Sequence, residues 1–425
     1  MNSSSWRRVG ASVLVMAVGA AGLVDSAAPD GSAAAGSAAA DSAAAGAAAD
    51  GGQGSQLVTT WGASDDIAGG TLNDMTVRNI MRTSVGGRDL RIRLSNAHGD
   101  QPLVTDSVYV GRHQAGASVV PGTSRRLTFG GKESVRIPPG GMAISDPLPG
   151  AVPAQTSVTV SLHVVGTTGV ITAHNRAMQH SYKSTSGDHA ADESATAYQT
   201  ESSAWFFLNA AIVTAPQQVD TVATLGDSIT SSVGSTIDTN RRWPDVLADR
   251  YAELPEHRRL GISNEGISGN RVLNGVAKAG SAGPSALARL DRDVLTKPGV
   301  RTVLVLEGIN DIYAGASADE LIDGYRQLIT RVHASGRCIV GGTITPVGGS
   351  FVYTPEKEAA RQAVNEFIRN SGEFDGVVDF DAATRDPADP SRLQAAYDGG
   401  DGLHPNDAGS HAMGNAANLD TLRCD

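Results

Sequence analysis

Val219-Asp-Thr-Val-Ala-Thr-Leu-Gly-Asp-Ser-Ile-Thr230 is the stretch of sequence that decides the fold of this chain. Its first half is apolar and β-branched, which predicts a short buried strand. Gly226 then permits a sharp turn, and Ile229 is expected to open a helix. Ser228 would expose its hydroxyl on that turn and place its backbone N–H at a helix N-terminus, where negative charge is favoured. Gly-Asp-Ser alone is more typical of a polar turn, so a nucleophile here requires a base and oxyanion donors elsewhere.

After Pro216 the sequence alternates between predicted strands and predicted helices. Such alternation indicates a parallel sheet covered by helices on both faces. Further strands are expected at residues 262–265, 302–306, 338–344 and 377–380. Helices are expected from Trp243-Pro244, with the proline in the first helical position, at 285–295, from a Ser-x-x-Glu capping box at 317–320 to Gly336, and at 355–370. Sites in parallel sheets form beyond the carboxyl ends of the strands.

Two of the expected strands are followed by groups that could stabilise a developing oxyanion. Gly269, in the segment 264–270, could present its backbone N–H because no side chain blocks the approach. Asn310, in the segment Gly-Ile-Asn-Asp at 308–311, could donate from its side-chain amide. Each segment is also typical of an ordinary turn or helix cap.

The segment Asp-Gly-Leu-His-Pro-Asn at 401–406 could supply the base. His404 can take the serine proton, because an ordinary histidine side chain has a pKa near ~6.5. Asp401, three residues earlier, can orient and stabilise the imidazolium. The alternative is a surface turn rich in Asp, Gly and Pro.

Together these segments resemble the SGNH/GDSL hydrolase superfamily. The serine, glycine, asparagine and histidine of its name match Ser228, Gly269, Asn310 and His404, and Asp401 matches the aspartate three residues before the histidine. The resemblance extends from Val219 to the C-terminus. It implies a flavodoxin-like three-layer α/β fold and ester hydrolysis through an acyl-enzyme, without a metal or an organic cofactor. It also implies an oxyanion hole formed by the serine and glycine N–H groups and the asparagine amide.

Residues 55–215 are expected to form an all-β domain ahead of a hydrolase domain at 216–425. Apolar residues alternate with polar ones at 90–94 and 158–164, which predicts half-buried strands, and Gly-Gly pairs punctuate the region. Many short strands with Gly-rich turns suggest a jelly-roll-like sandwich. The region resembles, more loosely, the accessory domain of carbohydrate-directed family members. Residues 188–193 carry Asp, His and Glu side chains and are interpreted as a solvated loop rather than a calcium or zinc site.

The N-terminal residues are typical of an exported protein. Arg7 and Arg8 precede an apolar run of small residues, so residues 1–28 are interpreted as a signal peptide, with an uncleaved anchor as the alternative. Residues 29–54 are nearly all Ala, Gly, Ser and Asp and predict a disordered linker. Export places Cys338 and Cys424 in an oxidising compartment, where a disulfide is expected. No other segment predicts a membrane span.

The expected function is that of a secreted serine esterase that removes small acyl groups from polysaccharide or other carbohydrate esters. A lipase or phospholipase of the same superfamily is the alternative, and a glycan-binding protein on an inactive hydrolase scaffold is an alternative of a different class. The net charge of −11, without a long basic run, argues against nucleic acid as a partner. The sequence does not indicate an oligomeric state.

Overall fold

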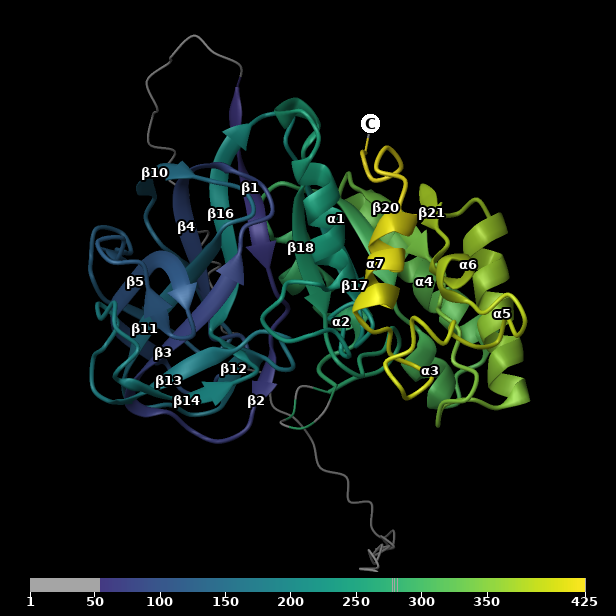
Figure 1. The fold of residues 1–425 in the computed structure, drawn as a ribbon, viewed down its shortest axis with the longest axis horizontal. Helices are drawn as coiled ribbons and strands as arrows, with labels where there is room; N and C mark the ends of the chain where they lie inside the picture. The colour runs from purple at the N-terminus through teal and green to yellow at the C-terminus, as the bar shows by residue number, and fades with distance from the viewer. Residues whose placement is uncertain (1–53, 277, 279, 281, 425) are drawn as a thin grey trace, which may run out of the picture. The chain divides into compact units, whose positions relative to one another are not determined.

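The structure is a computed structural model that describes residues 54–276, 278, 280 and 282–424 (Figure 1). The expected signal peptide and linker lie outside the described residues, apart from Gly54. Within the described part of the chain, no helix is both long and apolar enough to cross a membrane.

The C-terminal region is built on a five-stranded parallel sheet. Its strands are β17 (Thr221–Gly226), β18 (Gly261–Gly266), β19 (Val300–Leu306), β20 (Cys338–Gly342) and β21 (Gly376–Val378). Their spatial order, β18-β17-β19-β20-β21, is 2-1-3-4-5 in chain order, the doubly wound order of flavodoxin-like folds. Every residue of β17 is buried, as expected for an interior strand of a sheet that is covered on both faces.

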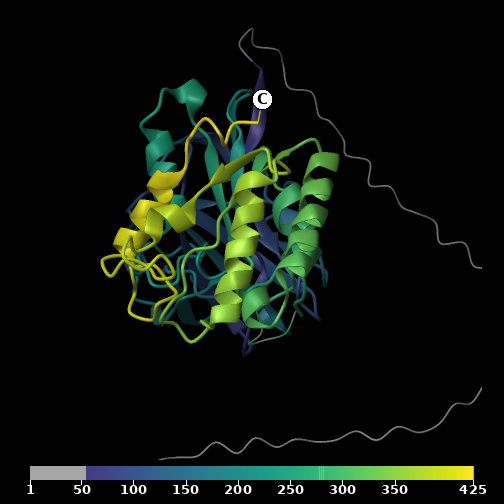
Figure 2. The same ribbon diagram turned by 90° about the vertical axis from the view of Figure 1, so that its right-hand side faces the viewer.

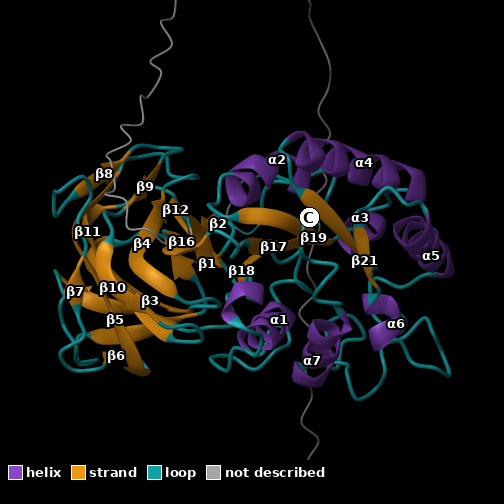
Figure 3. Ribbon diagram, turned by 90° about the horizontal axis from the view of Figure 1, so that it is seen from above, coloured by secondary structure: helices purple, strands orange, loops and turns teal. Residues whose placement is uncertain are grey.

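Helices cover both faces of this sheet, which gives the predicted three-layer arrangement (Figure 3). One layer contains α1 (Trp243–Ala252), α6 (Phe380–Thr384) and α7 (Asp407–Ala416); the other contains α2 (Ala286–Leu290), α3 (Ile309–Tyr313), α4 (Ala318–Ala334) and α5 (Pro355–Asn370). The two long helices α4 and α5 lie side by side in Figure 2. The capping box at Ser317 and Glu320 is present, and Gly336, with φ 71°, lies just beyond the end of α4.

Two local predictions about helices are wrong. Ile229 does not open a helix, because residues 227–235 form successive turns. Short polar side chains compete with the helical backbone bonds there: the hydroxyl of Ser231 donates to the Asp227 carbonyl, and Ser232 has φ 56°. Pro244 occupies the second position of α1 rather than the first, which is Trp243.

The N-terminal region is strand-rich, as predicted, and its sheets are antiparallel. One sheet has the order β1-β16-β4-β10 with β9 on β4, a second has β14-β13-β3-β11-β5-β6 with β7 and β8 on β5, and a third has β15-β12-β2. The strands are β1 (Ser55–Gly62), β2 (Asp66–Ala68), β3 (Asn73–Arg82), β4 (Gly87–Ser95), β5 (Leu103–Ala115), β6 (Ser118–Val119), β7 (Arg125–Arg126), β8 (Val135–Ile137), β9 (Met142–Ile144), β10 (Leu148–Val152), β11 (Ser157–Thr167), β12 (Ile171–His174), β13 (Ser181–Ser186), β14 (Tyr198–Ser202), β15 (Trp205–Phe206) and β16 (Leu208–Pro216). The jelly-roll-like topology stays a prediction.

Strands β4 and β11 are more deeply buried than their alternating patterns predicted. In β11 the polar residues Thr159, Ser161 and His163 are buried together with the apolar ones. In β4 the side chain of Arg93 is buried and donates to Asn209 Oδ1 at 2.6 Å. Both strands therefore bury their polar face as well, because other parts of the chain cover it and supply hydrogen-bond partners.

Residues on either side of the expected boundary at 216 belong to different sheets. Strand β16 ends at Pro216 in the N-terminal region, and β17 begins at Thr221 in the parallel sheet. The two regions nevertheless share buried contacts: Ala63 forms a parallel β-bridge with Asn264, and Ser64 donates to the carboxylate of Glu265. The division into two domains stays a prediction.

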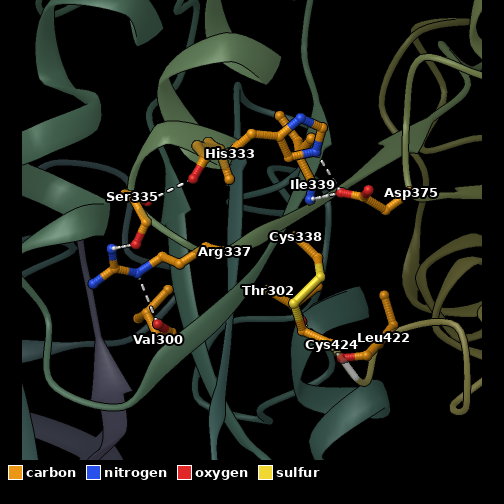
Figure 4. Close-up of a disulfide and its surroundings, with 11 residues drawn as sticks. Val300, Thr302, His333, Ser335, Arg337, Cys338, Ile339, Asp375, Leu422 and Cys424 are labelled. Atoms are coloured by element: carbon orange, nitrogen blue, oxygen red, sulfur yellow. Dashed lines mark hydrogen bonds and ion pairs between the residues drawn. A yellow bond between two sulfur atoms is a disulfide. The ribbon is translucent and has the colours of Figure 1, made fainter.

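Cys338 and Cys424 form the expected disulfide (Figure 4). Their Cα atoms lie 5.6 Å apart, and Cys338 is the first residue of β20. Next to the disulfide, Thr302 Oγ1 donates to the Leu422 carbonyl at 3.0 Å. The C-terminal segment is thus held against the edge of the sheet at which the strands begin.

Candidate active site

The turn after β17 places Ser228 at the carboxyl end of the parallel sheet. The turn requires glycine at position 226, because a Cβ atom there would lie 2.1 Å from Thr230 Oγ1 and 2.3 Å from the Leu306 carbonyl oxygen. Asp227 fixes the next step, since its carboxylate accepts the backbone N–H of Ile229 at 2.9 Å. The tight packing around Gly226 thus determines where the Ser228 side chain begins.

The structure brings Ser228, His404 and Asp401 together, although Ser228 and His404 are 176 residues apart in the chain. Ser228 Oγ lies 2.9 Å from His404 Nε2, and His404 Nδ1 lies 2.7 Å from Asp401 Oδ2. A hydroxyl, an imidazole and a carboxylate joined in this order form the arrangement that activates a serine nucleophile.

Asp401 is held in place by the loop that it belongs to. Its second oxygen accepts the backbone N–H groups of Leu403 and His404, at 3.0 and 2.8 Å. Burial alone would raise the pKa of Asp401, but these hydrogen bonds and the bond to the His404 ring hold the pKa below its ordinary value of 3.8. The carboxylate is therefore charged at neutral pH and can stabilise a positive charge on the imidazole.

The two expected oxyanion donors lie on the segments that follow β18 and β19. Gly269 has φ 79°, a left-handed conformation that favours glycine, and it is partly exposed. Asn310 lies in the first turn of α3, and its Nδ2 donates to the Asn270 carbonyl at 3.0 Å and to Asp227 Oδ2 at 3.4 Å. Because Asp227 directly precedes Ser228, the contact with Asp227 places the Asn310 amide beside the turn that carries Ser228.

Arg289 is a buried residue that bonds several segments of the site. This role was not predicted from the sequence. Its buried guanidinium donates to the carbonyls of Gly226 and Glu265, at 2.9 and 2.8 Å, and to Asn270 Oδ1 at 2.8 Å. It therefore ties the end of β17 to the end of β18 and to the residue after Gly269. The available signal was its position on the apolar side of an amphipathic helix, beside Ala286 and Leu290.

Three acidic side chains lie buried beneath the same strand ends. Burial raises the pKa of Glu307 to about 8 and that of Asp227 to about 7, and the neighbouring carboxyl groups add to both shifts. Burial likewise raises the pKa of Asp311, although the backbone N–H groups of Leu273 and Val272 oppose the shift. Arg289 is the nearby cation, with Nη2 at 3.8 Å from Glu307 Oε2.

The N-terminal region contributes a loop to the surroundings of the site. Arg176, between β12 and β13, has its Nη1 3.4 Å from the hydroxyl of Ser268, the residue before Gly269. In the same loop, the ring and the backbone N–H of His180 bond the carboxylate of Asp238 at 2.6 and 2.7 Å. Asp238 belongs to the segment that follows the Ser228 turn, so this loop contacts both that segment and the residue before Gly269.

Among the described residues, potential metal ligands gather away from this site, in the N-terminal strands. Asp106, His163 and Asp188 each offer an atom within 4.8 Å of the others. The remaining acidic groups of the 188–193 loop have partners nearby: Asp192 bonds the His189 ring at 2.9 Å, and Glu193 accepts backbone N–H groups at 122 and 124.

A parallel α/β sheet with a serine, a histidine and an aspartate in contact beyond its carboxyl edge has the arrangement that serine hydrolases use. Residues 224–412 match the model of the GDSL-like Lipase/Acylhydrolase family. The C-terminal region therefore belongs to the SGNH/GDSL hydrolase superfamily, and the chain is a serine ester hydrolase.

The chain is similar to several solved structures at low sequence identity. A putative lipolytic protein of the G-D-S-L family from Desulfitobacterium hafniense is 18% identical, with 48% of this chain and 99% of that chain covered and a TM-score of 0.37. The aryl esterase of M. smegmatis is 17% identical, with 47% and 96% covered and a TM-score of 0.37. A carbohydrate acetylesterase family member from Sinorhizobium meliloti is 17% identical, with 47% and 95% covered and a TM-score of 0.38. No curated protein matches the chain.

Proposed function

We propose that this chain is a secreted esterase that removes small acyl groups from carbohydrate esters through a covalent acyl-enzyme on Ser228. The observation that carries the proposal is the hydrogen-bonded series from Ser228 Oγ through the His404 ring to Asp401, with distances of 2.9 and 2.7 Å. Both contacts lie within the range expected of a nucleophile and its base.

The reaction proceeds in two steps. His404 Nε2 takes the proton as Ser228 Oγ attacks the ester carbonyl carbon, and Asp401 stabilises the resulting imidazolium. The bond from that carbon to the alcohol oxygen then breaks, and His404 returns the proton to the leaving alcohol. Water then loses a proton to His404 as its oxygen bonds the acyl carbon. The bond from that carbon to Ser228 Oγ breaks, His404 returns the proton to Oγ, and the acid leaves.

The negative charge that develops on the carbonyl oxygen is stabilised by the backbone N–H groups of Ser228 and Gly269 and by the amide of Asn310. Of the two contacts that Asn310 Nδ2 makes, the one to Asp227 is the longer at 3.4 Å, and the one to the Asn270 carbonyl is 3.0 Å. The amide can keep the shorter contact and turn its other hydrogen towards the substrate oxygen.

We propose a carbohydrate ester rather than a lipid as the substrate, because the described part of the chain offers no long apolar lid. The loops that lie beside the candidate nucleophile are instead polar, as the contacts of Arg176 and His180 show. A lipase or phospholipase of the same superfamily is the second candidate, and a long apolar acyl preference would identify it.

The proposal is tested with the purified mature protein and its Ser228→Ala variant. Nitrophenyl esters of increasing acyl length and acetylated xylan are the substrates. We expect the wild type to favour short acyl groups and to release acetate from the xylan, and the variant to lose activity on all of them. Equal activity of the two proteins would contradict the assignment of Ser228, and glycan binding without hydrolysis by the wild type would indicate a binding protein. Mass analysis of the protein found in the culture medium tests export and signal cleavage.

A further inference from the structure

Two aromatic rings lie exposed on the surface of the hydrolase region. The side chains of Phe351 and Tyr313 are 69% and 44% exposed, whereas most large apolar side chains of this region are buried. Their ring centroids lie 5.5 Å apart with planes at 88°, an edge-to-face contact. Two exposed aromatic rings in contact form a contiguous apolar surface, and such surfaces are candidate binding sites.

The chain connects these rings to both sides of the candidate active site. Tyr313 lies three residues after Asn310 on α3, and residues at that spacing share one face of a helix. Phe351 follows Ser350, whose backbone N lies 2.9 Å from the position that a Cβ atom on Gly402 would take. Its loop therefore lies against the segment that carries Asp401 and His404. One ring of the pair thus belongs to the helix that carries Asn310, and the other belongs to a loop that packs against the His404 segment.

The surroundings of the rings are polar. Lys357, in the first turn of α5, has Nζ 4.6 Å from the centroid of the Tyr313 ring. Tyr313 also carries a hydroxyl, and the neighbouring Tyr353 is 36% exposed. An exposed aromatic ring bordered by a cation and hydroxyls suits a ligand with an apolar face and polar edges. A pyranose ring has this character, because its C–H groups form one face and its hydroxyls lie around the edge. An alkyl chain does not.

We propose that Tyr313 and Phe351 form a subsite that stacks the pyranose ring of the leaving alcohol. The inference rests on the proposed esterase function and adds a binding site for the alcohol part of the substrate. The sugar lies on the rings while its ester carbonyl reaches Ser228. The rings then contribute to selection of the alcohol, and the oxyanion donors act on the carbonyl whatever the alcohol is.

The test compares esters that share one acyl group and differ in the alcohol. The substrates are acetylated methyl glycosides of xylose and glucose, phenyl acetate and ethyl acetate, and the proteins are the wild type, Phe351→Ala, and Ile144→Ala as a control. Ile144 is 47% exposed and lies in β9 of the N-terminal region. We expect Phe351→Ala to lower the ratio of kcat/KM for the glycoside acetates to kcat/KM for ethyl acetate by about tenfold, the effect of losing one aromatic contact. Ile144→Ala should leave the ratio unchanged.

An unchanged ratio in Phe351→Ala would overturn the proposal. A fall confined to phenyl acetate would also overturn it, because the rings would then select an aryl alcohol. If the wild type hydrolyses none of the esters, the esterase proposal fails, and binding decides the subsite. Calorimetric titration of Ser228→Ala and of Ser228→Ala/Phe351→Ala with xylohexaose and cellohexaose would then support the subsite if only the first protein binds, and would refute it if both bind equally or neither binds.

Discussion

The side chain of Asn310 gives the most direct test of the oxyanion hole at the scale of a single residue. Its amide is tied to the Asn270 carbonyl and lies 3.4 Å from Asp227, so it is positioned before substrate binds. Because the carbonyl oxygen gains charge only as Ser228 attacks, Asn310→Ala should lower kcat by roughly 10²–10³ and change KM little.

Steady-state kinetics on a short nitrophenyl ester measure this effect. Asn415→Ala, at an exposed position of α7, is the matched control and should retain wild-type kinetics. Near-normal kcat in Asn310→Ala would show that this residue only shapes the turn, even if Ser228 and His404 are essential.

Glu307 makes stability depend on pH in an unusual direction. Burial raises its pKa to about 8, with the carboxyl groups of Asp227 and Asp311 adding to the shift and Arg289 opposing it. In the unfolded chain a glutamate loses its proton near its ordinary value of 4.5. Between these values the folded state holds a proton that the unfolded state does not, so this group's contribution to stability decreases as pH rises, by up to ~1.4 kcal/mol per pH unit.

Glu307→Gln is neutral at every pH and should remove this contribution. We expect the free energy of unfolding of the variant to increase relative to that of the wild type as pH rises from 5.5 to 8. Chemical denaturation measures both values. Glu366→Gln, at an exposed position of α5, is the control and should follow the wild type. A constant difference between Glu307→Gln and the wild type would show that Glu307 is already ionised in this range.

The candidate catalytic residues could be predicted because each one lies in a short motif: Ser228 in the turn after β17, and Asp401 and His404 in the loop before α7. To recognise the triad of Ser228, His404 and Asp401, one needs only the identity of the residues at these three positions. Arg289 and Glu307 could not be predicted, because their roles depend on partners that only the folded sheet brings together. A buried charge has no signature in sequence beyond an unexpected position on an apolar face.

At the scale of the element, Gly226 decides whether β17 can end in its turn. A Cβ atom at this position would lie 2.3 Å from the Leu306 carbonyl oxygen, a backbone atom of β19 that cannot move without the sheet. Gly226→Ala should therefore reduce the free energy of unfolding by ~1–3 kcal/mol, the usual cost of overpacking a core, and reduce activity as well.

Thermal and chemical denaturation measure the change. Gly69→Ala is the matched control, because a Cβ atom there would meet nothing within 4 Å and the backbone is not left-handed. Its stability should stay within ~0.5 kcal/mol of the wild type. Wild-type stability in Gly226→Ala would show that the turn relaxes more readily than its packing indicates.

Elements with strong end signals were predicted well, and those shaped by neighbours were not. Helix α4 begins where its capping box placed it, and the predicted bounds of α5 match the structure. The helix expected to open at Ile229 is absent, because serine side chains in this segment compete for the backbone bonds that a helix needs. Strands β4 and β11 are a second example. Their alternating patterns predicted that one face is exposed to solvent, but other parts of the chain cover both faces.

At the scale of the whole molecule, the buried ion pair of Glu265 and Lys297 joins the two regions. Both side chains are fully buried and in direct contact. Lys297 Nζ also donates to the Ala63 carbonyl of the N-terminal region at 3.2 Å, and Ser64 Oγ donates to Glu265 at 2.9 Å. Disruption of the pair should therefore weaken the folded state of both regions together.

Lys297→Met leaves Glu265 buried without its cation, so we expect the free energy of unfolding to fall by ~3–5 kcal/mol. Because the N-terminal region supplies two of the hydrogen bonds, its near-UV signal from Trp61 and the activity of the hydrolase region should be lost at the same denaturant concentration.

Arg326→Met is the control: its partner Glu373 lies on the surface, and the stability should stay close to that of the wild type. Glu265→Leu combined with Lys297→Met should recover much of the loss, because an apolar pair can replace a buried ion pair. If Lys297→Met lowered the two transitions by different amounts, the regions would unfold independently and the pair would stabilise only the one that contains it.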